Sequence, residues 1–254
     1  MPREVLHHAD LNAMIKYPDG THEIQNFDGP TILIPGRVEA WLRPKLPNVI
    51  DRSRMTREER PALPFELVRE AVVNALVHRD YDVTGATCHL VVTADTVTVR
   101  SPGAPLLHIT VEQMQDFSAP MYNRNPKLQF AFGGAKLAEG RGLGMKTLGE
   151  AATKHGLPLP KYDFDGVYLN LTIYRNARSA VRELGEKILG MLNKDERAAW
   201  EFIATRKAVT SPDLSERMKF DERKAQRVLK KLQGVGLLRR EGKGPATRYD
   251  VVRS

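Results

Sequence analysis

Apolar residues recur along residues 69–81 at the spacing of an amphipathic helix, and a polar stripe runs through them. Glu70, Asn74 and His78 lie four residues apart, which places their side chains along one face of the predicted helix. Valines flank that stripe, so it is not an ordinary solvent-facing surface. A carboxylate and an amide held in an apolar cleft are groups that a site for a nucleotide and a metal ion needs.

The hydrophobic period changes after this helix. Residues 87–93 and 96–100 are rich in β-branched residues and predict two antiparallel strands joined by a tight turn. The sequence Ser-Pro-Gly at 101–103 predicts a break directly after the second strand. A further strand is predicted at 166–174, where apolar residues alternate from Val167 onward.

The rest of this part of the chain adds helices to the strands. The other predicted elements are a hairpin at 14–17 and 21–24, a charged connection at 51–61, and helices at 38–46, 126–132 and 145–155. We therefore predict an α+β fold, an α/β sandwich with helices on one face of a mixed sheet.

The pattern beyond residue 176 predicts a second domain. A connecting helix is expected at 177–193. Helices at 195–206, 210–218 and 221–233 are followed by a strand, a glycine-rich turn and a second strand. Three helices and a hairpin in this order predict a winged helix-turn-helix. The predicted domains are 1–176, with an irregular part at 1–60, and 194–254, joined by 177–193.

Composition limits the size of the domains and the classes of protein to which the chain can belong. A chain of 254 residues with 41% hydrophobic content can bury the cores of two domains. Its one cysteine, Cys88, excludes an internal disulfide and any multi-cysteine zinc site. No run of 18 apolar residues occurs and the first residues do not resemble a signal peptide. We therefore expect no membrane span and a cytoplasmic location.

The net charge of +8 is concentrated in the last third of the chain. Residues 177–254 carry 19 lysines and arginines against 11 acidic residues, so residues 1–176 are neutral overall. A basic domain after a neutral one indicates double-stranded DNA as a partner, although a solvated basic face is the alternative. The expected base-reading residues are Arg223, Lys224 and Arg227, and Lys230 and Lys231 are further expected DNA contacts. The expected phosphate contacts on the wing are Arg239, Arg240, Lys243 and Arg248.

Candidate chemistry in the first domain centres on the polar stripe and on the sequence GRGLG at 140–144. Asn74 offers a neutral oxygen to Mg²⁺, and Glu70 offers a base for an attacking water. The glycines permit close approach of backbone N–H groups to phosphates, and Arg141 and Lys146 add charge. Taken alone, a Glu four residues before an Asn is common in helices, and GRGLG also suits a structural turn.

Four motifs in order resemble a known family. They are REAVVNALVHRDY, SPGAPL, RNP and GRGLGMKTL, and they resemble the GHKL (Bergerat) ATPase fold shared by gyrase, histidine kinases and MutL. More closely, they are similar to bacterial proteins described as "RecG-like, C-terminal" or "ATP-binding, Schlafen-AlbA-associated", in which a winged helix commonly follows. The resemblance covers roughly residues 20–175.

The resemblance implies roles for individual residues. Glu70 matches the general base and Asn74 the magnesium ligand, while His78 opens the HRDY signature, for which the sequence suggests no role. The implied nucleotide contacts are Asn74, His78, Gly103, Arg124, Asn125, Gly140, Arg141, Gly142, Leu143, Gly144 and Lys146. One departure is clear: these ATPases hold adenine with the Asp of a D-x-G-x-G box, and residues 101–103 contain no Asp.

The expected function is an ATP-binding transcriptional regulator. ATP and Mg²⁺ bound by the GHKL-like domain would alter DNA binding by the winged helix, in a homodimer, with any hydrolysis slow and dependent on Glu70. Two alternatives stay open: a non-enzymatic DNA-binding protein with a degenerate GHKL scaffold, and the ATPase component of a nucleic-acid-processing or phage-defence system.

Overall fold

The computed structural model describes residues 9–46, 49–51, 58–60, 63–137, 144–242, 244 and 247–252. The chain divides into two compact units. Unit 1 comprises residues 1–151 and 160–175, and unit 2 comprises residues 152–159 and 176–254.

Unit 1 is built on a six-stranded sheet with the order β2-β1-β5-β6-β8-β7. The strands are β1 (Leu11–Lys16), β2 (His22–Phe27), β5 (Cys88–Val92), β6 (Thr96–Pro102), β7 (Lys161–Phe164) and β8 (Tyr168–Tyr174). Neighbouring strands are antiparallel except β1 and β5, which run parallel. The sheet is therefore mixed, as predicted. A separate antiparallel pair is formed by β3 (Val49–Asp51) and β4 (Glu58–Arg60).

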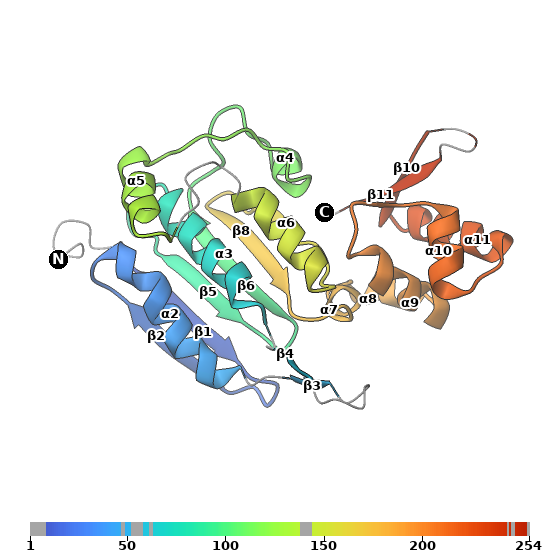
Figure 1. The fold of residues 1–254 in the computed structure, drawn as a ribbon, viewed down its shortest axis with the longest axis horizontal. Helices are drawn as coiled ribbons and strands as arrows, with labels where there is room; N and C mark the ends of the chain where they lie inside the picture. Colours follow the sequence, from blue (N-terminus) through green and yellow to red (C-terminus); the bar gives the residue numbers. More distant parts are fainter. Residues whose placement is uncertain are drawn as a thin grey trace. The chain divides into compact units, whose positions relative to one another are not determined.

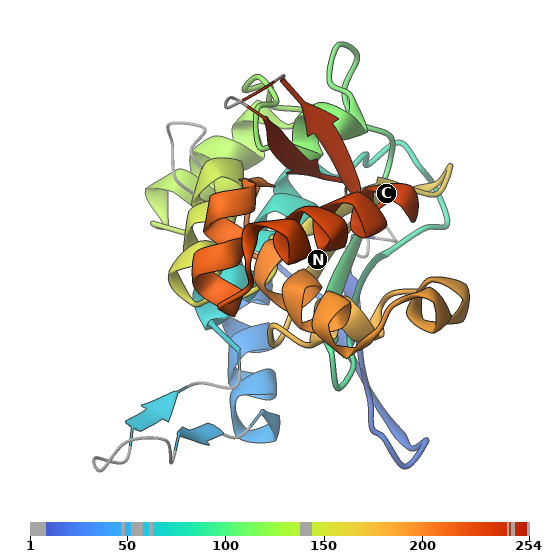
Figure 2. The ribbon, with the colours of Figure 1, turned by 90° about the vertical axis from the view of Figure 1, so that its right-hand side faces the viewer.

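Helices cover one face of this sheet. The helical segments of this part of the chain are η1 (Thr31–Leu33), α2 (Ile34–Leu42), η2 (Arg43–Lys45), α3 (Phe65–Val77), α4 (Val111–Gln115), α5 (Pro126–Gly134) and α6 (Gly144–Lys154). Helices α2, α3 and α6 lie side by side over the sheet (Figure 1), and Figure 2 shows α2 and α3 on the same side of it. Alternate residues of β1 and β5 are buried under them, which forms the core.

Helix α3 occupies the centre of that layer, and nine of its 13 residues are buried. It runs from Phe65 to Val77, so the run at 69–81 was predicted to stay helical four residues too far at its end. Pro64 in extended conformation marks its start, because proline suits the entrance of a helix. His78 ends it, and residues 79–81 lie beyond the helix.

Other boundaries also differ from the predictions. Ser101 and Pro102 continue β6 and pair with β8, so the break comes at Gly103. Helix α2 begins at Ile34 and not at residue 38, because Pro35 fits its first turn. Strand β7 was not predicted. The hairpin of β1 and β2, the antiparallel pair β5 and β6, and helices α5 and α6 are confirmed with small changes in length.

Unit 2 contains helices and a small three-stranded sheet of order β10-β11-β9. Its elements are α7 (Ser179–Arg182), α8 (Glu186–Met191), α9 (Lys194–Ile203), β9 (Ala208–Val209), α10 (Ser211–Met218), α11 (Glu222–Gly234), β10 (Leu238–Glu241) and β11 (Arg248–Val251). The predicted connecting helix at 177–193 is two short helices, because Gly185 is extended between them. Strand β9 was not predicted.

The three longer helices of unit 2 follow local sequence signals. Asn193 and Thr210 form capping boxes at the starts of α9 and α10, and Asp221 accepts from the backbone N–H of Lys224 at the start of α11. Trp200 and Leu229 are buried, and the Trp200 indole donates to Ala180 O of α7 over 3.2 Å. Among all described residues, no helix is long and apolar enough to cross a membrane.

Candidate functional site

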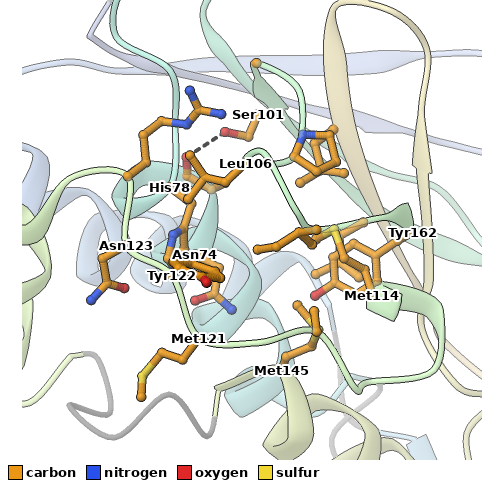
Figure 3. Close-up of a pocket in the computed structure, with 18 of the residues that line it drawn as sticks. Asn74, His78, Ser101, Leu106, Met114, Met121, Tyr122, Asn123, Met145 and Tyr162 are labelled. Carbon is orange, nitrogen blue, oxygen red and sulfur yellow. Dashed lines mark hydrogen bonds between the residues drawn. The ribbon is translucent and has the colours of Figure 1, made fainter. Parts of the chain in front are cut away.

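A cavity of about 160 Å³ opens between α3, the sheet and the segment that follows β6 (Figure 3). Its floor is formed by Val99 and Ser101 of β6 and by Leu169 and Leu171 of β8. Residues 103–124, the start of α6 and Tyr162 of β7 complete the wall. Most of these side chains are apolar, so the cavity suits a flat apolar group with polar contacts at one side.

The polar stripe of α3 reaches this cavity as its spacing predicts. Glu70, Asn74 and His78 all line it. The Asn74 amide donates from Nδ2 to Glu70 Oε1 over 3.1 Å, and Asn74 Oδ1 takes no part in this bond. Ala71 and Ala75 also line the cavity, and their small side chains give it room.

Side chains from three other segments bond to the last carbonyls of α3. These carbonyls lack partners within a helix and need donors when they are buried. Ser101 Oγ donates to Ala75 O (2.8 Å), Tyr81 OH to Leu76 O (3.0 Å), and Asn125 Nδ2 to Val77 O and Arg79 O (2.8 Å each). The SPG, HRDY and RNP motifs therefore meet at one place, the carboxyl end of the helix that carries Glu70 and Asn74.

An ion pair ties the same motifs together beside the cavity. Arg124 Nη1 lies 2.7 Å from Asp80 Oδ2, and Arg124 Nη2 donates to Ala104 O over 2.6 Å. Asp80 N donates to Pro102 O over 2.9 Å. Gly103 has a φ of 111°, and a Cβ there would overlap the Cβ of Asp80. The close approach of Asp80 is thus enough to require glycine at position 103. The Arg124 guanidinium is already bonded to Asp80 and to Ala104 O.

The remaining members of the HRDY signature are structural. Arg79 is fully buried, donates from Nη2 to Ala86 O, and lies over the Tyr81 ring at 5.1 Å. Burial raises the pKa of Tyr81 to about 12, so its hydroxyl keeps its proton and remains a donor to Leu76 O. A sequence signal for this role exists, because Arg79, Asp80 and Tyr81 directly follow His78, the last residue of the polar stripe.

Two titratable side chains in the cavity are held in their neutral forms. Burial, and then the positive charge of Arg124, lower the pKa of His78 below its usual range. Burial, and then the negative charge of Glu70, raise the pKa of Tyr162. Near neutral pH the cavity therefore presents a neutral imidazole and a neutral phenol beside Glu70.

Several predicted contacts lie elsewhere. Asn125 acts on α3 and does not line the cavity, and Lys146 is exposed with Nζ 3.8 Å from Glu150 Oε1. Gly140, Arg141, Gly142 and Leu143 lie outside the described residues, and Gly144 is the first residue of α6. Tyr162 and the apolar wall residues such as Met114 and Met121 were not predicted, because no local pattern in the sequence relates them to α3.

The described residues fit a nucleotide with Mg²⁺ in part. The apolar floor suits a base, and the N-terminus of α6 borders the cavity through Met145, where helix N–H groups favour phosphate. Within the described wall, Arg124 is the one cation. No group of three His, Cys, Asp or Glu residues able to hold a metal occurs among the residues described. On the polar stripe, Glu70 and Asn74 carry oxygen atoms of the kind that Mg²⁺ prefers, and Mg²⁺ usually keeps several waters.

Comparisons with known proteins agree with an ATPase-like domain. Residues 85–173 match the family described as "Putative ATP-dependent DNA helicase recG C-terminal". The predicted RecG-like resemblance is confirmed over this range, which runs from just before β5 to the end of β8 and does not include α3. No curated protein matches the chain.

A solved structure shares the fold. The DIP2311 protein from Corynebacterium diphtheriae is 18% identical, with a TM-score of 0.58 over 96% of this chain and 51% of that one. The present chain thus spans about half the length of that protein. The likeness supports the mixed α/β architecture.

The predicted DNA contacts of unit 2 fall into two groups. Arg223, Arg227 and Lys230 are exposed on one face of α11 and line a hollow together with Gln226, which was not predicted. Lys231 and Arg240 are also exposed, and Lys243 lies outside the described residues. The other predicted contacts are engaged within unit 2: Lys224 Nζ is 2.7 Å from Asp195 Oδ2, Arg239 Nε is 3.0 Å from Glu241 Oε1, and Arg248 Nε is 3.1 Å from Asp250 Oδ1.

Proposed function

We propose that unit 1 binds ATP with Mg²⁺ in the cavity beside α3. One observation carries this: a carboxylate, an amide, an apolar floor and a helix N-terminus converge on one cavity in a unit whose residues 85–173 match an ATPase-like family. Asn74 Oδ1 would bind the metal, and the backbone N–H groups at the start of α6 would face the phosphates. A bound magnesium ion would neutralise negative charge on the phosphate oxygens.

Calorimetric titration of the full chain with ATP and Mg²⁺ tests this proposal. Wild type is expected to bind, and Asn74→Ala to weaken binding roughly tenfold or more, because the metal loses its protein oxygen. Asn12→Ala is the matched control: it removes an amide that bonds Thr87 and does not line the cavity. Absence of binding by wild type at millimolar ATP would overturn the proposal.

Any hydrolysis is assigned to Glu70. It is 7% exposed, lines the cavity and accepts from the Asn74 amide, so its carboxylate would take the proton of a water bound in the cavity. Glu70→Ala is expected to retain ATP binding and to lower phosphate release by roughly 10²-fold or more. Equal phosphate release by the two proteins would contradict a catalytic role.

For unit 2 we propose a winged helix that binds duplex DNA. Helices α9, α10 and α11 followed by β10 and β11 have the order of that motif, and α11 exposes a basic face. Together the units would form a homodimeric transcriptional regulator in which nucleotide alters DNA binding. Affinity for DNA should fall steeply with salt, and an affinity unchanged between low and moderate salt would count against this face.

A second candidate is a DNA-binding protein whose GHKL-like unit binds no nucleotide. It is favoured by Ser101, which stands where the related ATPases have an adenine-binding Asp. The melting temperature separates the candidates: ATP with Mg²⁺ raises it only if unit 1 binds nucleotide.

A further inference from the structure

The floor of the cavity is an apolar surface with a single polar member. In the register of the sheet, Val99 pairs with Leu171 and Ser101 with Leu169, and Leu171 pairs in turn with Tyr162. All five residues line the cavity. A planar ring placed on Val99, Leu169, Leu171 and Ser101 would therefore meet three aliphatic side chains and the hydroxyl of Ser101, while the phenol of Tyr162 is a second hydroxyl, in the wall of the cavity.

The proton of that hydroxyl is already committed. Ser101 Oγ donates to Ala75 O over 2.8 Å (Figure 3), and Ser101 is 8% exposed. Ala75 O belongs to the last turn of α3, whose carbonyls need donors from outside the helix. The other donor recorded at this carbonyl is the Cys88 thiol at 3.7 Å, which is weak. Turning the Ser101 proton toward a ligand would thus weaken the end of α3.

Ser101 therefore offers a ligand lone pairs only. A hydroxyl that donates its one proton keeps its acceptor capacity. A group facing it must be a donor, and a carbonyl oxygen there would meet lone pairs and leave buried acceptors unpaired. The acceptor is also neutral, so it does not demand a positively charged partner.

We propose that Ser101 determines the base specificity of the cavity by accepting a hydrogen bond from the exocyclic amino group of adenine. This inference rests on the proposed nucleotide binding and adds the residue that reads the base. The oxygen at position 6 of guanine is an acceptor and would oppose Ser101 Oγ. The hydroxyl thus replaces a carboxylate as the adenine contact while it also caps α3.

The test compares ATP with purine riboside triphosphate, which lacks only the 6-amino group, by calorimetry of the full chain with Mg²⁺. Wild type is expected to bind ATP roughly tenfold more tightly, because the analogue leaves a buried acceptor unpaired. In Ser101→Ala the ratio should fall close to one. Tyr81→Phe is the matched control: it removes the donor to Leu76 O, the neighbouring carbonyl, from outside the cavity, and should keep the wild-type ratio.

The outcomes separate this inference from the proposed function. Equal affinity of wild type for the two nucleotides overturns the role of Ser101 while nucleotide binding stands. If folded Ser101→Ala keeps the wild-type ratio of affinities for ATP and the analogue, the role of Ser101 is also overturned while nucleotide binding stands. Failure of wild type to bind either nucleotide overturns nucleotide binding and the inference with it. The wild-type ratio decides the matter if Ser101→Ala does not fold.

Discussion

Helices α3 and α11 have the same length and opposite surroundings. Each contains 13 residues, but nine residues of α3 are buried and four of α11. Glu70 and Asn74 of α3 face a cavity inside unit 1, whereas most polar residues of α11 face solvent. A polar stripe on a helix thus has two meanings: on α3 it is enclosed and poised for a small ligand, and on α11 it is open and suited to a large polyanion.

The two helices also end in different ways. Asp221 caps α11 through a bond to Lys224 N, three residues away, and Leu237 N returns to Leu232 O at its end. The end of α3 is held by Ser101 and Asn125, which lie 26 and 48 residues from the carbonyls they bond. Helix α11 is therefore specified locally, and α3 depends on the fold around it.

The largest expected effect follows from that dependence. Asn125→Ala removes the donor to Val77 O and Arg79 O, so two buried carbonyls lose a partner. We expect the free energy of unfolding to fall by about 2–4 kcal/mol in urea denaturation. Asn123→Ala, an exposed neighbour, is the control and should change it by less than about 0.5 kcal/mol. Equal effects of the two would show that α3 does not depend on its distant cap.

A smaller effect is expected on the open face of α11. Arg227→Ala should weaken binding of a labelled random-sequence duplex roughly tenfold at low salt, because its exposed guanidinium is available to DNA. Lys224→Ala should weaken it less than about threefold, since Nζ is paired with Asp195 Oδ2 and lies 4.2 Å over the Phe220 ring. Fluorescence anisotropy measures both. If Lys224→Ala were the more damaging change, the assignment of the exposed face would be wrong.

The sequence predicted the locally specified helix α11 more accurately than α3, whose end depends on distant residues. The range 221–233 for α11 was correct to one residue, because its cap and its apolar spacing are local. The polar stripe of α3 was also predicted, since spacing of four places side chains on one face. The end of α3 was not predicted correctly, because its carbonyls are bonded by Tyr81, Ser101 and Asn125 only in the folded chain.

The remaining differences have the same cause. Ser101 and Pro102 were predicted as a break, and pairing with β8 about 67 residues later keeps them in the strand. Strands β7 and β9 are four and two residues long, too short for a periodic signal, and exist through their partners β8 and β11. The cavity itself is assembled from such long-range pairs. Sequence therefore predicted the chemistry carried by α3 and could not predict the wall that it faces.

The smallest expected effect concerns pH and separates the helices once more. Burial and the charge of Arg124 lower the pKa of His78 in the folded protein, whereas the unfolded chain keeps a value near 6.5. The unfolded chain therefore binds more protons in the window below pH 6.5, and stability present at pH 7 is lost as the pH falls through that window.

His78→Gln should reduce this loss of stability only in part, because His89, whose pKa is also lowered by burial, still contributes. Urea denaturation between about pH 7 and 5 measures the slope, with the exposed His22→Gln as control. Helix α11 contains no histidine, so its contribution should not change over this range. A slope that His78→Gln leaves unchanged would mean that His78 is not enclosed as α3 places it.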